Sequence, residues 1–88
     1  MTMHIKVHFF QFVGMYQRNT SYESFDGTPE EVLVQLRQFC EKEGYQYVQP
    51  EIRDFFGDIR LREESIPLEQ VTAELLGNYD DFGLSKKP

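Results

Sequence analysis

Apolar and polar residues alternate with a period of two over residues 3–13. This period predicts a β-strand that buries one side and exposes the other. The alternation breaks at Phe9, where we expect a bulge or a fully buried segment. Gly14 and the polar residues 17–20 predict a turn, and residues 20–25 predict a return strand, so the chain is expected to begin with a β-hairpin.

The segment DGTPEE, residues 26–31, carries the signals of a helix start. Thr28 is in the capping position, Pro29 follows it, and Glu31 has the spacing of a capping box. Gly44 is a stop signal, so we expect a helix that runs to about residue 43. Its apolar face is expected to contain Val32, Leu33, Leu36, Phe39 and Cys40.

The remaining elements are less regular. Residues 45–49 predict a strand, and Gly57-Asp58 predicts a two-residue turn between two short strands. Residues 65–78 predict a second helix, because Leu, Glu and Ala dominate and Gly77 provides a stop signal. The alternative is a last strand in the same segment, VTAELL.

These elements predict an α+β fold in which each element has one apolar side to bury. We expect a small two-layer sandwich with an antiparallel sheet of four to five strands and two helices on one face, in the order β-β-α-β-β-α. The domain is expected to span residues 1–84, and residues 85–88 are expected to form a disordered tail.

Composition and charge exclude several classes of function. The chain has 88 residues and a net charge of −6, and its only cluster of cations is Lys86-Lys87, which disfavours direct nucleic-acid binding. No apolar stretch is long enough to span a membrane, and a signal-peptide pattern is not expected. Since Cys40 is the single cysteine, a cytoplasmic location is the simplest interpretation. The acidity either maintains solubility or attracts a basic partner.

No residue pattern specifies catalysis or a cofactor. His4 and His8 lie about 13 Å apart on a straight strand, which is too far for one metal ion, so we expect both on its solvated side. The alternative is a small basic patch with Lys6. Cys40 is expected to be a core thiol, and Asp80-Asp81 lacks the spacing of a calcium loop. We therefore expect no metal, no cofactor and no enzymatic activity.

Residues 77–84, GNYDDFGL, place apolar groups in an acidic, irregular setting. One interpretation is a docking segment, in which Tyr79 and Phe82 enter pockets of a partner protein while Asp80 and Asp81 meet its basic residues. The alternative is that the segment folds back and closes the core.

The hairpin predicted over residues 53–62 is the second candidate surface. Phe55 and Phe56 are adjacent, so a regular strand turns one toward the core and the other away from it. The outward ring, for which Phe56 is the candidate, is expected to be covered by the second helix, the tail, a second copy of the chain or a partner. Arg60 and Arg62 are expected on the solvent-exposed face of the second strand of this hairpin, where they either contact a partner or are neutralised by neighbouring glutamates. An outer strand of this kind can also pair with a second copy, giving a homodimer.

The opening IKVHFF and the later FDGTPEEVLVQL resemble the first half of ubiquitin-like sulfur carriers. The resemblance implies a strand-strand-helix start within a β-grasp fold. Those carriers end in Gly-Gly, whereas this sequence ends in LSKKP, so their thiocarboxylate chemistry does not transfer.

Together these patterns predict a small acidic protein-binding module, such as an inhibitor, an immunity-type protein, an adaptor or a minor subunit. The alternative is a small-molecule-binding domain or minor enzyme with an aromatic pocket between sheet and helices.

Overall fold

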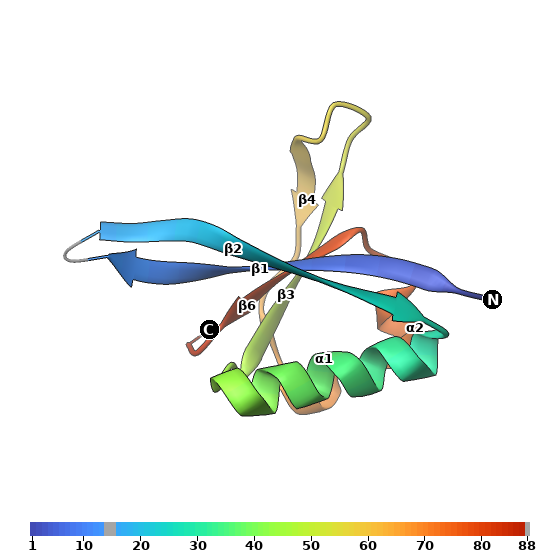
Figure 1. Ribbon diagram of the computed structural model, residues 1–88. Coiled ribbons are helices and arrows are strands. Elements are labelled where there is room, and N and C mark those ends of the chain that lie inside the picture. The colour runs from blue at the N-terminus through green and yellow to red at the C-terminus, as the bar shows by residue number, and fades with distance from the viewer. Residues whose placement is uncertain (14–15, 88) are drawn as a thin grey trace.

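The computed structural model describes the backbone of residues 1–13 and 16–87 and the side chains of residues 1–9 and 22–87. It has an α+β fold (Figure 1). In chain order the elements are β1 (Met3–Val13), β2 (Tyr16–Gly27), α1 (Pro29–Glu43), β3 (Tyr47–Arg53), β4 (Ile59–Arg62), β5 (Ile66–Pro67), the 3-10 helix η1 (Leu68–Gln70), α2 (Ala73–Leu76) and β6 (Asp81–Ser85).

The six strands form one mixed sheet in the order β2-β1-β6-β3-β4, and β5 pairs with β3 beside this path. The last strand, β6, lies between β1 and β3; it is parallel to β1 and antiparallel to β3. The predicted antiparallel sheet of four to five strands is therefore wrong in strand count and in direction. The cause is β6, which enters the middle of the sheet from the far end of the chain.

The predicted strand-strand-helix start is present. The register of β1 with β2 shifts after Phe9, as the broken alternation indicates. The predicted turn at residues 17–20 is wrong, because β2 begins at Tyr16, while Gly14 lies outside the described residues. Part of this hairpin projects beyond α1 (Figure 1).

Helix α1 begins and ends as its sequence predicts. The Thr28 hydroxyl accepts from the Glu31 amide at 3.2 Å, and the Glu31 carboxylate accepts from the Thr28 amide at the same distance. Gly44 ends the helix with φ of 84°, a left-handed conformation that favours glycine. Val32, Leu36 and Cys40 are buried against the sheet, which confirms the predicted apolar face.

The predicted second helix over residues 65–78 is wrong, and so is the alternative strand. Ile66 and Pro67 pair with β3, and α2 is a single turn that starts after the Thr72 cap. Between them Val71 is extended with ψ of 127° and is completely buried. Tertiary packing of Val71 thus interrupts the helix that residue composition alone favours.

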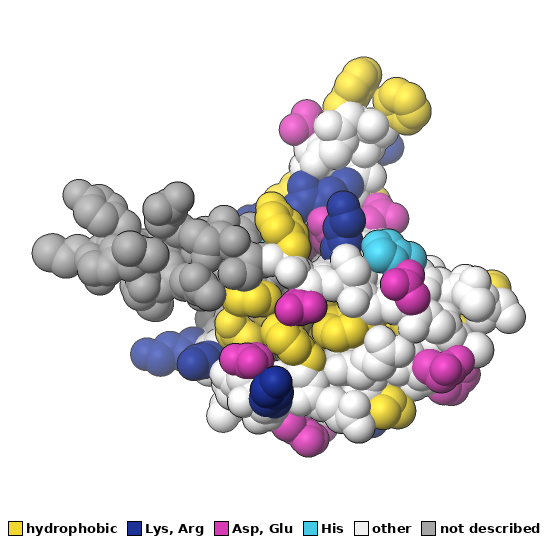
Figure 2. Space-filling model, in the orientation of Figure 1, with side chains coloured by type: hydrophobic (Ala, Val, Ile, Leu, Met, Phe, Trp, Pro, Cys, Tyr) yellow, Lys and Arg dark blue, Asp and Glu magenta, His cyan; other side chains and the backbone are white. Residues whose placement is uncertain are grey.

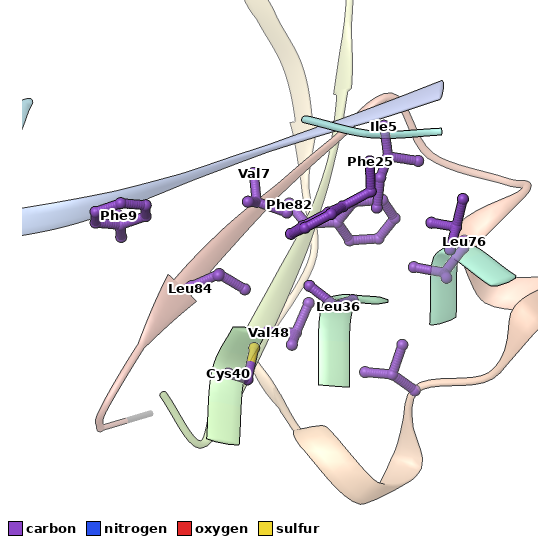
Figure 3. Close-up of a cluster of buried hydrophobic side chains, with 12 residues drawn as sticks. Ile5, Val7, Phe9, Phe25, Leu36, Cys40, Val48, Leu76, Phe82 and Leu84 are labelled. Carbon is purple, nitrogen blue, oxygen red and sulfur yellow. The ribbon is translucent and has the colours of Figure 1, made fainter. Parts of the chain in front are cut away.

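The core lies between α1 and one face of the sheet. Phe82 of β6 sits among its side chains (Figure 3) and is completely buried. Ser85, which was expected in a disordered tail, is the last residue of β6. The fully buried members of the cluster, with exposed fractions of 1% or less, are Ile5, Val7, Val32, Leu36, Cys40, Val48, Val71, Leu76, Phe82 and Leu84.

The burial of Phe82 gives a matched pair of stability measurements. We predict that Phe82→Ala lowers the free energy of unfolding by about 3–5 kcal/mol, because it empties a phenyl-sized space in the core. Phe55→Ala, at a side chain that is 95% exposed, should change it by less than about 0.5 kcal/mol. Urea unfolding measures both, and Phe82→Leu provides a milder variant. Equal losses for Phe82→Ala and Phe55→Ala would contradict this placement of β6.

Candidate functional site

The face of the sheet opposite α1, called the open face here, carries a set of basic and acidic side chains. Alternation along β1, β3 and β6 turns their polar residues away from the core. This set consists of Lys6, His8, Glu51, Arg53, Arg62 and Asp81.

The centre of the set is a contact that crosses a whole strand. His8 of β1 is opposite Gly83 of β6, and Gly83 is in turn opposite Gln49 of β3. Over Gly83, the Nε2 atom of His8 lies 2.5 Å from the Oε1 atom of Glu51. A Cβ atom at position 83 would lie only 3.2 Å from Cε1 of His8, so glycine leaves the space that the ring occupies.

Glu51 is the most deeply placed charge of this face, with no exposed surface. Its second oxygen accepts from Nε of Arg62 at 2.7 Å, so both oxygens have partners. Burial acts to raise the pKa of Glu51, but the hydrogen bonds from His8 and Arg62 outweigh it and the pKa is lowered. Glu51 is therefore a carboxylate at neutral pH, held between two basic side chains.

A second ion pair joins β3 to β6. Nε of Arg53 donates to Oδ2 of Asp81, and this bond raises the pKa of Arg53. The backbone amide of Arg53 also donates to Oδ2 of Asp80 at 3.0 Å. Both aspartates of the predicted docking segment are thus used inside the chain.

Residues 54–58 form the loop that connects β3 to β4, so the predicted two-residue turn is wrong. Hydrogen bonds within the hairpin order this loop. Oδ1 of Asp54 accepts from the amides of Phe56 at 2.9 Å and Asp58 at 3.0 Å. Nη1 of Arg53 donates to the Gly57 carbonyl at 2.7 Å, and Gly57 has φ of 86°. Side-chain and backbone hydrogen bonds therefore link Asp54, Phe56, Gly57 and Asp58 within this loop.

This loop presents two aromatic side chains to solvent. Phe55 is 95% exposed and Phe56 is 84% exposed, and their rings meet edge to face with centroids 5.6 Å apart. We call this pair the Phe tip. Figure 2 shows hydrophobic side chains at the outer end of the projecting hairpin and Lys and Arg side chains gathered at its base.

Of the four contact residues predicted in the docking segment, only Asp80 is exposed. Phe82 is buried in the core, and Asp81 is only 8% exposed. Tyr79 is half-buried, and the centroid of its ring lies 6.3 Å from that of the Phe82 ring. The structure therefore has the alternative arrangement, in which residues 77–84 fold back. Asp80 is exposed, but it bonds to the Arg53 amide.

The second predicted surface remains accessible. Phe56, Arg60 and Arg62 are exposed. Arg62 is neutralised by Glu51, which the sequence pattern did not indicate, and not by the glutamates that follow it. Phe55 is the most exposed aromatic residue among those described, so the expectation that one ring of the pair faces the core is wrong; both rings lie in a turn and not in a strand.

The two histidines differ in environment. His4 is exposed and lies 2.5 Å from Asp26 on β2, whereas His8 is 4% exposed, so the expectation that both are solvated is wrong for His8. The strand period correctly places both on one face, but the partners that bury His8 come from β3 and β6.

Burial, assisted by Glu41, raises the pKa of the Cys40 thiol to about 11, which leaves little nucleophilic thiolate at neutral pH.

A cleft of about 500 Å³ lies on the open face, where Lys6, Tyr22, Arg53, Gly57 and Asp81 line it. We call it the hairpin cleft. The alternative predicted pocket lay between sheet and helices, but core side chains of α1 and the strands pack there. Among the described residues, no group of three or more potential ligands can hold a metal ion, and no helix is long and apolar enough to cross a membrane.

Comparisons with known proteins find no similar chain: no family model, no curated protein and no solved structure matches this sequence or fold. Function is therefore inferred from the geometry of the open face and its hairpin.

The contact over Gly83 can be tested by adding one methyl group. We predict that Gly83→Ala destabilises the fold by about 1–3 kcal/mol, because the new Cβ crowds the His8 ring that Glu51 holds. Gly77→Ala is the matched control: φ at Gly77 is −74° and the nearest atom is 3.5 Å away. Denaturant unfolding should show a loss for Gly83→Ala alone, and a gain in stability there would contradict the contact.

The lowered pKa of Glu51 predicts loss of stability in acid. Its unfolded value is near 4.5, so its stabilising contribution is complete above that pH and is lost as pH falls through the lower folded value. The free energy of unfolding of the wild type should therefore fall more steeply below pH 4.5 than that of Glu51→Gln. Arg62→Gln should fall less steeply than wild type. Parallel pH profiles for wild type and Glu51→Gln would refute the prediction.

Proposed function

We propose that this chain is a protein-binding module whose principal contact is the Phe tip, and that it acts by binding and not by catalysis. The observation that carries the proposal is the exposure of Phe55 and Phe56, 95% and 84%, at the end of a projecting hairpin. The exposure of large apolar side chains to water is unfavourable, and clusters of such side chains are typical of surfaces that another protein covers.

The construction of the loop supports this role. Asp54 and Arg53 fix the backbone on both sides of the Phe tip through five hydrogen bonds. The Phe56 and Asp58 amides donate to the Asp54 side chain, and the Gly57 amide donates to the Asp54 carbonyl. The Asp54 amide donates to the Asp58 carbonyl, and the Arg53 side chain donates to the Gly57 carbonyl. A loop that is ordered before binding loses less conformational entropy on binding. The tip is therefore suited to enter a preformed apolar pocket of its partner.

The tip is large enough to provide much of an interface. A fully buried phenylalanine removes about 150–250 Å² of surface from water. At roughly 25 cal/mol per Å² of apolar surface, each ring contributes a few kcal/mol. Two adjacent aromatic anchors correspond to the small set of residues that dominates most protein interfaces.

Features of the outer strand disfavour a homodimer through edge pairing. β4 has only four residues, its register with β3 shifts after Ile52, and it carries Arg60 and Arg62. Short strands, irregular register and charges are the features that protect sheet edges from pairing. Antiparallel pairing of two copies of β4 would also bring arginines opposite one another. These features favour a different protein as the partner.

The test captures partners from the native cell lysate on the immobilised full chain. Wild type should retain a protein that Phe55→Ala/Phe56→Ala loses by tenfold or more, because truncation removes both anchors. Val34→Ala is the matched control, since Val34 is 54% exposed but lies on α1, away from the hairpin. Sedimentation of each purified variant reports whether any of them self-associates.

Two outcomes would refute this proposal. In one, wild type and the double variant retain the same proteins in the same amounts. In the other, purified wild type sediments as a dimer that the double variant abolishes, in which case the tip is a contact between copies of this chain.

A further inference from the structure

The hairpin cleft adjoins the Phe tip and shares residues with it. Lys6 comes from β1, Tyr22 from β2, Asp81 from β6, and Arg53 with Gly57 from the β3–β4 hairpin. Gly57 belongs to the loop that carries the tip, and Arg53 bonds directly to its carbonyl. A partner that covers the tip is therefore in position to reach the cleft. At about 500 Å³, the cleft has the volume of a typical ligand site.

The charge of the cleft lining is positive, although the chain as a whole has a net charge of −6. The one carboxylate of the lining, Asp81, already accepts from Nε of Arg53. Lys6 is exposed and has no ion pair with any described residue. The described lining therefore holds two cations against one anion, which leaves one positive charge for a ligand to neutralise.

The geometry of Arg53 suits a carboxylate. Nε of Arg53 donates to Asp81 and Nη1 donates to the Gly57 carbonyl, so these two hydrogen bonds hold the guanidinium in place. Nη2 donates to no described residue. Guanidinium groups that are fixed in this way bind carboxylates with defined geometry. Because a single net charge remains beside Asp81, a monoanion fits better than a dianionic phosphate.

Tyr22 provides the aromatic side chain of the described lining. It is 62% exposed, so its ring is available to the aliphatic part of a ligand. Aspartate and glutamate side chains combine a carboxylate with such an aliphatic part. We propose that the hairpin cleft binds a carboxylate side chain in an acidic segment of the partner protein, beside the pocket that takes the Phe tip. This inference rests on the proposed function.

A direct titration tests the cleft without the partner. The probe is an acetylated and amidated oligoglutamate peptide, added to the ¹⁵N-labelled full chain, so that only side-chain carboxylates are offered. Saturable amide shifts are expected at Lys6, Tyr22, Arg53 and Gly57 at millimolar peptide. Lys6→Gln should weaken binding about fivefold, the equivalent of about 1 kcal/mol for a partly exposed ion pair. Lys42→Gln, the same change at an exposed site on α1, should not.

Inorganic phosphate at matched ionic strength and an oligolysine peptide complete the titration. Neither should reproduce the shifts. If no localised shifts occur, if Lys6→Gln and Lys42→Gln bind the peptide equally, or if phosphate gives the same shifts, the inference is wrong.

The tip variant separates this inference from the proposed function. Phe55→Ala/Phe56→Ala should bind the oligoglutamate peptide as wild type does, because the tip is outside the described lining of the cleft. In the capture experiment, Lys6→Gln should retain the partner less well than Lys42→Gln. A partner that is lost by the tip variant and retained fully by Lys6→Gln would overturn the carboxylate site and leave the proposed function standing.

Discussion

The contact between His8 and Glu51 is the interaction on which the open face depends. It joins the first strand to the third across the last one, and it exists because Gly83 leaves room for the imidazole ring. Two charged or polar side chains at 4% and 0% exposure are tolerated only when hydrogen bonds replace their water. Arg62 completes that replacement on the second oxygen of Glu51. The contact therefore connects β1, β3 and β4 over β6.

The two candidate binding features follow from this arrangement. With β3 fixed beside β6, Arg53 reaches both Asp81 and the loop at the end of the hairpin. The same guanidinium thus orders the loop that presents the Phe tip and lines the hairpin cleft. An apolar anchor beside a cationic recess is an arrangement that combines affinity from buried aromatic surface with specificity from charge.

Sequence signals predicted those parts of the fold that are determined by residues close together in the chain. The Thr28 cap and Gly44 stop defined α1, and strand alternation defined β1 with its irregularity after Phe9. The exposure of both Phe55 and Phe56 did not follow from alternation, which turns one of two adjacent residues toward the core, because they lie in a loop and not in a strand. The central position of β6 did not follow either, because its pairing with β1 depends on residues more than 70 positions apart. The His8–Glu51 contact was missed for the same reason, since alternation gives the face of a side chain but not its partner.

A double-mutant cycle on His8 and Glu51 tests most directly whether their contact organises the open face. The free energies of unfolding of His8→Gln, Glu51→Gln and the double variant are compared with that of wild type at neutral pH. The two residues should be coupled by about 1–3 kcal/mol, because each single change removes the hydrogen bond that joins two buried side chains. Single-variant losses that add to within about 0.5 kcal/mol would contradict the contact and the strand order built on it.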